Sequence, residues 1–392
     1  MPSVVIVEAV RTPVGRRGGG LAAVHATELL GSVQREVLVR AGVEAAEVGQ
    51  VVGGCVGQVG MQSYNVTRTA WLAAGLPIEV PATTVDAQCG SSQQASTLAY
   101  GLVASGVSDV VLACGVEVMS RVPMGATTPR DPAVGKPINR AYWEHHEFTT
   151  QFEGAERIAE KHGITRAEAD RLGYSSQYRA AEAWREGRFD TQVAAVDVPV
   201  VDGDGKPTTT TQRIVRDEGL RQTTLDALAA LSPTGRPDGV HTAGTSSQIA
   251  DGASAVLLMT AERAMAAGLR PLATMVDVTL VGCDPVLMLE GPIPATRALL
   301  DGNRLDVDDI DVFEVNEAFA AVVLAWQREL EIGSERVNPN GGAIAHGHPL
   351  GATGTMLLTK AAHELRRRDG EHALVTMCCG GGLGTGTLLR RE

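Results

Sequence analysis

An internal repeat is the feature that most limits what this chain can fold into. Two segments, roughly 260 residues apart, carry the same order of apolar runs and helical patterns. The first set is a strand over 48–56, a loop at Cys89, a helix and an apolar strand ending at Gly115. The second set is a strand over 309–316, a loop at His348, a helix over 354–368 and a strand over 373–377.

Alternating strands and helices predict an α/β architecture. The strand over 109–115 is continuously apolar, which is typical of a sheet covered on both faces. Two similar halves would bring the ends of equivalent strands to one pseudo-symmetric centre. Cys89 and the glycines near the C-terminus would then meet despite their separation in sequence.

The chain has 392 residues, which are too many for one simple core. Its local composition changes near Met119. Proline, arginine and glycine become frequent there, and the regular alternation of strand and helix patterns resumes at Ala250. We therefore expect a first half over 1–118, completed by about 250–270, an inserted lid or loop domain over 119–249, and a second half over 271–392. Within the insertion we expect helices over 152–162 and 166–186, a strand over 196–200 and a turn over 202–207.

Two further local patterns give specific expectations. A helix over 27–41 has Thr27 as its predicted cap and Gly42 just past its end. The loop over 16–20 is basic and rich in glycine, which fits a phosphate-binding loop but fits a plain surface loop better.

Composition excludes several classes of protein. The net charge of −12 argues against a general nucleic-acid binder, which needs a basic face. No apolar run reaches membrane-spanning length, and the N-terminus lacks the pattern of a signal peptide. The six cysteines show neither zinc-ligand spacing nor a disulfide framework, so we expect no metal site and a reducing, cytoplasmic location.

Cys89 is the first candidate for chemistry. It is followed by glycine and two serines, and then by apolar residues at helical spacing. A cysteine at a helix start lies beside free backbone N–H groups and the positive end of the helix dipole, which favour the nucleophilic thiolate. The alternative is a buried structural cysteine, which is what most free cysteines are.

Three later stretches also stand out: Asn316 to Ala320 (NEAFA), 340–354 (NGGAIAHGHPLGATG) and 377–384 (MCCGGGLG). Each has a plain structural alternative. Asn316 could cap a helix, His348 could be a hydrogen-bonded core histidine, and Cys378 could be a core cysteine. Together with Cys89, however, they form a recognisable set.

That set resembles the thiolase family over essentially the whole chain. The motifs fall in family order: VEAVRTPVG, HATELLG, QCGSSQQA, TAGTSSQIADGASA, GPIPAT, NEAFA, NGGAIAHGHPLGATG and MCCGGGLGTG. The resemblance implies the thiolase fold, in which two similar βαβαβαββ halves form five αβαβα layers with an inserted lid. It also implies an acyltransferase that uses coenzyme A as a substrate, with no permanently bound cofactor, and that works as a homodimer or homotetramer.

The resemblance assigns roles to four side chains and one glycine. Cys89 would carry the acyl group as a thioester after His348 takes its proton. Cys378 would be the second acid or base, acting on the α-carbon of the acetyl group. One oxyanion site would combine His348 with a water held by Asn316, and the other would use the N–H groups of Cys89 and Gly380. Motif position favours Cys378 over Cys379, and strand alternation points the two side chains to opposite faces.

Residues that bind coenzyme A or the acyl group follow from the same resemblance. Arg221 would lie beside the nucleotide, and Met288 near the acyl group. Ser247 would contact pantetheine, in the stretch that starts at Ala243. Ala318 and Phe319 would line the tunnel. The basic residues near Arg221 could instead form a solvated surface.

The lid departs from the short-chain members of the family. Residues 151–159 (QFEGAERIA) lack the histidine and methionine that contact pantetheine in those members. This lid is more similar to those of thiolases that accept bulky acyl chains, including steroid side-chain esters. His346 is a second departure, because the family usually has a small or apolar residue there.

The expected activity is therefore thiolytic cleavage of a 3-ketoacyl-CoA in fatty acid or steroid degradation. The alternative is acetyl-CoA acetyltransferase, which runs the same chemistry as a condensation. A binding protein without turnover is disfavoured by the presence of all four polar residues. A ketosynthase-type enzyme is disfavoured by Cys378, because such enzymes typically use Cys-His-His or Cys-His-Asn sets.

Overall fold

The computed structural model describes residues 2–128, 131–201 and 207–392 and contains one large mixed sheet. β1 and β9 pair antiparallel over three residues and join the two halves of the sheet. In sheet order the strands are β10 (Val312–Val315), β11 (His372–Cys379), β12 (Leu383–Arg391), β9 (Ala273–Gly282), β1 (Val4–Arg11), β8 (Ala250–Thr260), β5 (Val110–Val118), β3 (Gln50–Gly54) and β4 (Ala82–Val85). The short β2 (Gly15–Arg16) pairs with β8.

The two halves of the sheet repeat one arrangement. In the first half β5 runs parallel to β3 and antiparallel to β8, and in the second β11 runs parallel to β10 and antiparallel to β12. β4 runs parallel to β3 at the edge, and a parallel bridge between Phe313 and Val337 takes its place in the second half. The repeat predicted from the sequence is therefore present.

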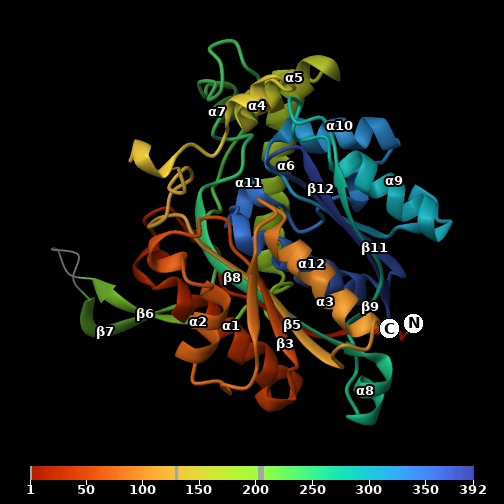
Figure 1. Ribbon diagram of the computed structural model, residues 1–392. Helices are drawn as coiled ribbons and strands as arrows, with labels where there is room; N and C mark the ends of the chain where they lie inside the picture. The colour runs from red at the N-terminus through yellow and green to blue at the C-terminus, as the bar shows by residue number, and fades with distance from the viewer. Residues whose placement is uncertain (1, 129–130, 202–206) are drawn as a thin grey trace.

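Helices form three layers around the two half-sheets (Figure 1). α1 (Ala26–Ala41) and α2 (Val66–Ala73) cover the outer face of the first half. α3 (Ser91–Ala104) and α12 (Leu350–Arg368) pack against each other between the halves, and their apolar residues share one core with both. α9 (Pro292–Asn303) and α10 (Ala320–Leu330) cover the outer face of the second half. These are the five αβαβα layers that we expected.

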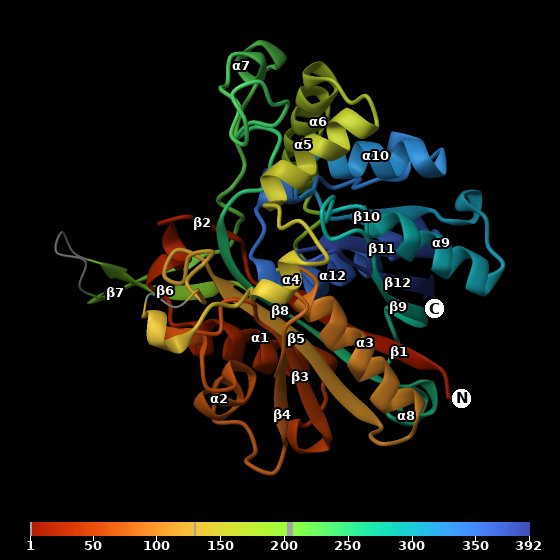
Figure 2. The same cartoon turned by 45° about the horizontal axis from the view of Figure 1, so that its top comes forward.

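The segment between β5 and β8 contains the helices and strands of the expected lid (Figure 2). They are α4 (Arg140–Trp143), α5 (Gln151–Lys161), α6 (Arg166–Arg185), β6 (Val196–Val201), β7 (Pro207–Ile214) and α7 (Leu225–Ala229). α5 and α6 pack on α10, and β6 and β7 form a separate two-stranded sheet. β8 completes the first half-sheet, so we propose to keep the division into 1–118, 119–249 and 271–392.

Several local expectations need correction. α1 begins at Ala26 and its cap is His25, whose ring accepts the N–H of Thr27, so Thr27 is not the cap. Gly42 does end α1, with φ +66°. The strand predicted over 48–56 spans only Gln50–Gly54, and α12 begins at Leu350, four residues before the prediction.

Two predicted loops have different outcomes. In the loop over 16–20, the Glu218 carboxylate accepts the N–H groups of Arg16 and Gly20, so the loop behaves as a structural turn. The turn predicted over 202–207 lies largely outside the described residues. The two α-helices of the described part of the chain not yet placed are α8 (Ala261–Ala266) and α11 (Ala343–His346). In this part, no helix combines the length and the apolar character needed to cross a membrane.

Candidate active site

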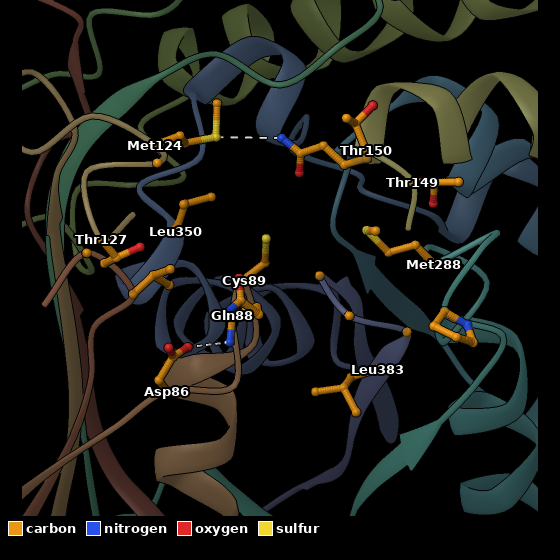
Figure 3. Close-up of a pocket in the computed structure, with 18 of the residues that line it drawn as sticks. Asp86, Gln88, Cys89, Met124, Thr127, Thr149, Thr150, Met288, Leu350 and Leu383 are labelled. Carbon is orange, nitrogen blue, oxygen red and sulfur yellow. Dashed lines mark hydrogen bonds between the residues drawn. The ribbon is translucent and has the colours of Figure 1, made fainter. Parts of the chain in front are cut away.

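Cys89 lies on a tight turn between β4 and α3. Gln88 has φ +52°, a left-handed conformation that costs a non-glycine residue about 1–3 kcal/mol. Its N–H is held by the Asp86 carboxylate at 2.7 Å, and its carbonyl accepts the N–H of Ser91 at 2.9 Å. The turn directs the Cys89 sulfur into a cavity (Figure 3).

Gly90 is the cap of α3 and has no room for a side chain. A Cβ there would lie 2.5 Å from the Cys379 Sγ and 2.7 Å from the Thr385 Cγ2. The glycine after Cys89 therefore lets α3 start directly against β11 and β12.

His348 is buried, and its hydrogen bonds fix its tautomer. The Thr353 hydroxyl lies 2.7 Å from Nδ1 and donates its single proton to the Pro349 carbonyl at 3.0 Å. Thr353 must therefore accept the Nδ1 proton, so Nε2 carries the lone pair and can accept a hydrogen bond or a proton. Burial lowers the pKa of His348 to about 4, so the ring is neutral near pH 7 and can act as a base.

Asn316 follows β10 and faces the same histidine. Its Nδ2 lies 3.3 Å from the His348 Nε2, and its backbone N–H is held by the Thr376 carbonyl. Its Oδ1 is buried without a hydrogen-bond partner among the described residues. We expect this oxygen to accept a hydrogen bond from a ligand or a water, because a buried unpaired acceptor costs about 1–3 kcal/mol.

Cys378 and Cys379 end β11, and their side chains point to opposite faces, as expected. Cys378 packs with Met288, Ala318 and Phe319, whereas Cys379 belongs to the core between the half-sheets. Burial, followed by the nearby Cys89 and Cys379 sulfurs, raises the pKa of the Cys378 thiol well above its usual value. Only Cys378 of the pair reaches the cavity that contains Cys89 and His348.

The electrostatics of Cys89 correct one expectation. Burial raises the pKa of the Cys89 thiol to about 11, although the backbone N–H groups of Gly380 and of Cys89 itself act in the opposite direction. The helix start thus does not produce a resting thiolate. The two N–H groups nevertheless converge on the sulfur, as donors of an oxyanion site would.

Two cavities meet at Cys89. The smaller, about 180 Å³, is lined by Cys89, His348 and Cys378 and also by the predicted ligand residues Ala243, Ser247, Ala318 and Phe319. The larger, about 990 Å³, is lined by Cys89, Gly380 and Met288 and extends along the lid (Figure 3).

Arg221 lines a third cavity of about 340 Å³, together with Arg216 and the stacked rings of Tyr174 and Tyr178. Its guanidinium donates to the Gln248 Oε1 at 3.1 Å, and Gln248 also lines the smaller cavity at Cys89. Asn316 contacts His348 but lines none of these cavities, whereas every other predicted site residue lines one of the three.

The sequence interpretation missed Thr353 and Gln248. Thr353 lies five residues past His348, which precedes the first residue of α12, so helical spacing alone does not predict their contact. Gln248 follows Ser247 directly, but its contacts with the carbonyls of Gly219 and Ile344 depend on the tertiary fold.

His346 has a structural explanation. Its Nδ1 lies 2.9 Å from the Asp217 Oδ2, and its Nε2 lies 2.8 Å from the Asn340 carbonyl oxygen. Asp217 also pairs with Arg11 at 2.7 Å. Burial acts to raise the pKa of Asp217, but Arg11 and His346 together hold it below its usual range. In the described part of the chain, no group of three or more His, Cys, Asp or Glu side chains is placed to hold a metal ion.

Comparison with known proteins identifies the family. Residues 4–262 match the model of the thiolase N-terminal domain, and residues 269–391 match that of the thiolase C-terminal domain. The chain belongs to the thiolase family. Thiolases are acyltransferases, and the motifs recognised in the sequence are those of this family.

Relatives and solved structures agree over the full length of this thiolase. It is 43% identical to the steroid 3-ketoacyl-CoA thiolase FadA6 of Mycobacterium tuberculosis, over 100% of the chain and 95% of that protein. It is 40% identical to an acetyl-CoA acetyltransferase of Chromobacterium violaceum, over 99% of both. The crystal structure of the Bacillus anthracis acetyl-CoA acetyltransferase has a TM-score of 0.90 at 37% identity, over 100% of this chain and 99% of that one.

Proposed function

We propose that this thiolase cleaves 3-ketoacyl-CoA with coenzyme A, giving acetyl-CoA and a shortened acyl-CoA through an acyl group on Cys89. The observation that carries the proposal is the convergence of Cys89, His348 and Cys378 on one cavity, with Asn316 hydrogen-bonded to His348. These are the nucleophile, base and second acid that the reaction requires.

The first half-reaction forms the acyl-enzyme. The His348 Nε2 takes the Cys89 proton, and the sulfur attacks the keto carbon of the substrate. The bond between the α-carbon and the keto carbon breaks, and the α-carbon takes the Cys378 proton to leave as acetyl-CoA. A proton then passes from His348 to Cys378, which returns both groups to their neutral forms.

The second half-reaction releases the product. His348 takes the proton of the coenzyme A thiol, whose sulfur attacks the thioester on Cys89. The Cys89 sulfur leaves and recovers the proton from His348. We assign one oxyanion site to the N–H groups of Cys89 and Gly380, and the other to His348 with a water on Asn316.

Coenzyme A would run between the cavities. We place its nucleotide beside Arg221 and its pantetheine along Ser247, Ala243, Ala318 and Phe319, which line the cavity that opens onto Cys89. Gln248 bridges the two regions.

We further propose that the acyl group is bulky and apolar, as in steroid side-chain esters. The cavity of about 990 Å³ at Cys89 far exceeds the needs of an acetyl group. Its wall includes Met288, Tyr142, Phe148 and Met124. The name of the M. tuberculosis relative supports the same substrate class.

Thiolysis rates measured on acetoacetyl-, medium-chain, long-chain and steroid-type 3-ketoacyl-CoA esters test the substrate class. We expect the bulky esters to give the highest kcat/KM. Preference for acetoacetyl-CoA, together with efficient condensation of acetyl-CoA, would favour the acetyl-CoA acetyltransferase alternative.

Mass spectrometry tests the roles of the two cysteines. After mixing with acetyl-CoA, Cys89→Ala should show no acyl adduct, and an adduct that persists would refute Cys89 as the nucleophile. Cys378→Ala should still acquire the acyl group but lose thiolysis of 3-ketoacyl-CoA.

We also propose that the enzyme works in the cytoplasm as a homodimer or homotetramer without a permanently bound cofactor. Light scattering on the purified protein measures the oligomeric state. A monomer that retains full activity would contradict this part of the proposal.

A further inference from the structure

Glu117 is a buried carboxylate beside the proposed nucleophile. It lies on β5, next to the last residue of the strand, and is 1% exposed. Glu117 lines the larger cavity together with Cys89. Among the described residues no lysine, arginine or histidine pairs with it, so it is neither an ordinary ion pair nor one of the groups in the proposed mechanism.

The two carboxylate oxygens accept four hydrogen bonds. Oε1 accepts from the Gln62 Nε2 at 2.6 Å and the Gly57 N–H at 3.1 Å, and Oε2 accepts from the N–H groups of Val56 and Gly351, both at 3.0 Å. The pKa of Glu117 is raised, because burial outweighs the four hydrogen bonds, which act to lower it. Because all four partners are donors, the site is built for the ionised form.

Two glycines make room for the carboxylate. A Cβ at Gly57 would lie 2.9 Å from Oε1, and a Cβ at Gly351 would lie 2.9 Å from Oε2. The close approach of both backbones to Glu117 therefore depends on the absence of side chains at these positions.

The four donors come from both halves of the molecule. Val56 and Gly57 follow β3 in the first half, whereas Gly351 is the second residue of α12, three residues after His348. Glu117 thus ties the start of α12 to the half that carries Cys89.

We propose that Glu117 is a positioning residue, which holds the loop of His348 in register with Cys89 across the boundary between the halves. The inference rests on the proposed roles of Cys89 and His348. The negative charge of Glu117 has a second effect, because it also acts to keep the Cys89 thiol protonated in the resting enzyme.

The test uses two substitutions with different consequences. Glu117→Gln keeps the size but removes the charge and turns an NH₂ group toward backbone N–H donors. We expect kcat for thiolysis to fall about 10- to 100-fold with little change in the KM for coenzyme A, because a shift of about 1 Å at a reacting group has effects of this size. Glu117→Asp keeps the charge but shortens the reach, so kcat should fall while the pH midpoint of Cys89 alkylation stays near that of the wild type.

In Glu117→Gln the pH midpoint of Cys89 alkylation should move to lower pH, because the negative charge that disfavours the thiolate is gone. A merely structural role of Glu117 would not move this midpoint. Asp311→Asn is the matched control. Its carboxylate also clamps two backbone N–H groups, those of Glu371 and His372, but at the strand ends away from the site. It should leave both kcat and the midpoint unchanged.

A folded Glu117→Gln enzyme with kcat within twofold of the wild type and an unmoved midpoint would overturn the proposal. If neither Glu117 variant folds, the fallback is Gln62→Leu, which removes the 2.6 Å bond to Glu117 together with the bonds of Gln62 to the Gly57 carbonyl and the Val118 N–H. It must lower kcat in the same direction, and an unchanged kcat overturns the proposal. Absence of thiolysis in the wild type would instead count against the proposed function, because alkylation of Cys89 needs no turnover.

Discussion

At the scale of single residues, Cys89 and His348 are both uncharged in the resting site. Burial raises the pKa of Cys89 to about 11 and lowers that of His348 to about 4. The proton therefore stays on the Cys89 sulfur until a substrate binds. The site therefore differs from one that stores a thiolate–imidazolium pair. The carbonyl of a bound substrate, held by preorganised N–H groups, must supply the driving force for attack.

The rate at which iodoacetamide alkylates Cys89 measures the ionised fraction of its thiol directly. The thiolate is the reactive form, and its fraction rises about tenfold per pH unit below the pKa. With a pKa raised to about 11, the rate should climb throughout the range from pH 7 to 10. A plateau below pH 8 would show that the resting cysteine is already ionised.

Thr353 controls which nitrogen of His348 carries the proton. In Thr353→Val the acceptor for the Nδ1 proton disappears, so the ring can turn or adopt the other tautomer. We expect kcat to fall about tenfold or more, as when outer partners of a histidine ligand are removed. Thr359→Val is the control, because the Thr359 hydroxyl bonds only a carbonyl of its own helix, that of Thr355. Equal kcat values in the two variants would count against a special role for Thr353.

At the scale of elements, the turn from β4 into α3 positions Cys89, the proposed nucleophile. It combines a left-handed Gln88 with a glycine cap that touches β11 and β12. A small change in this turn therefore moves the sulfur relative to the Gly380 N–H.

Gly90→Ala tests the turn. The new methyl group would collide with the Cys379 Sγ, and overpacking of this kind costs about 1–3 kcal/mol. We expect a lower free energy of unfolding in urea and slower acylation of Cys89. In a background of Cys379→Ala the same substitution should cost less, and an identical cost in both backgrounds would contradict the assigned contact.

At the scale of the whole molecule, the active site exists only because two halves pack closely. The central contact is between α3 and α12, where a Cβ at Gly354 would collide with the backbone of Gln93. On β5, a Cβ at Gly115 would likewise collide with the backbone of Gly351 in α12. This contact sets the distance between the half that carries Cys89 and the half that carries His348.

Gly354→Ala should separate the two central helices. We expect the free energy of unfolding to fall by about 3 kcal/mol or more, because the methyl group would meet backbone atoms that cannot yield. Gly101→Ala is the matched control on α3, since no atom of the described residues lies within 4 Å of its Cβ position. It should stabilise the protein by about 0.5–1 kcal/mol through the better helix propensity of alanine. Similar melting temperatures for the two variants would refute the packing argument.

The sequence by itself predicted most of the elements, the repeat and the candidate site residues. Apolar periodicity, glycine ends such as Gly42, and the motifs around Cys89, His348 and Cys378 are local patterns, so they can be read without the fold. The alternation of Cys378 and Cys379 was predicted in the same way. Cap positions such as His25 were not, because a ring nitrogen can replace the usual hydroxyl.

The tertiary structure decided the properties that depend on what packs around each group. The pKa of Cys89 follows from burial by both halves, which outweighs the helix start that the sequence shows. The four partners of Glu117, the bridge made by Gln248 and the size of the cavity at the lid all join segments far apart in the chain. Desolvation and hydrogen bonding act between spatial neighbours, and the sequence specifies those neighbours only after the chain has folded.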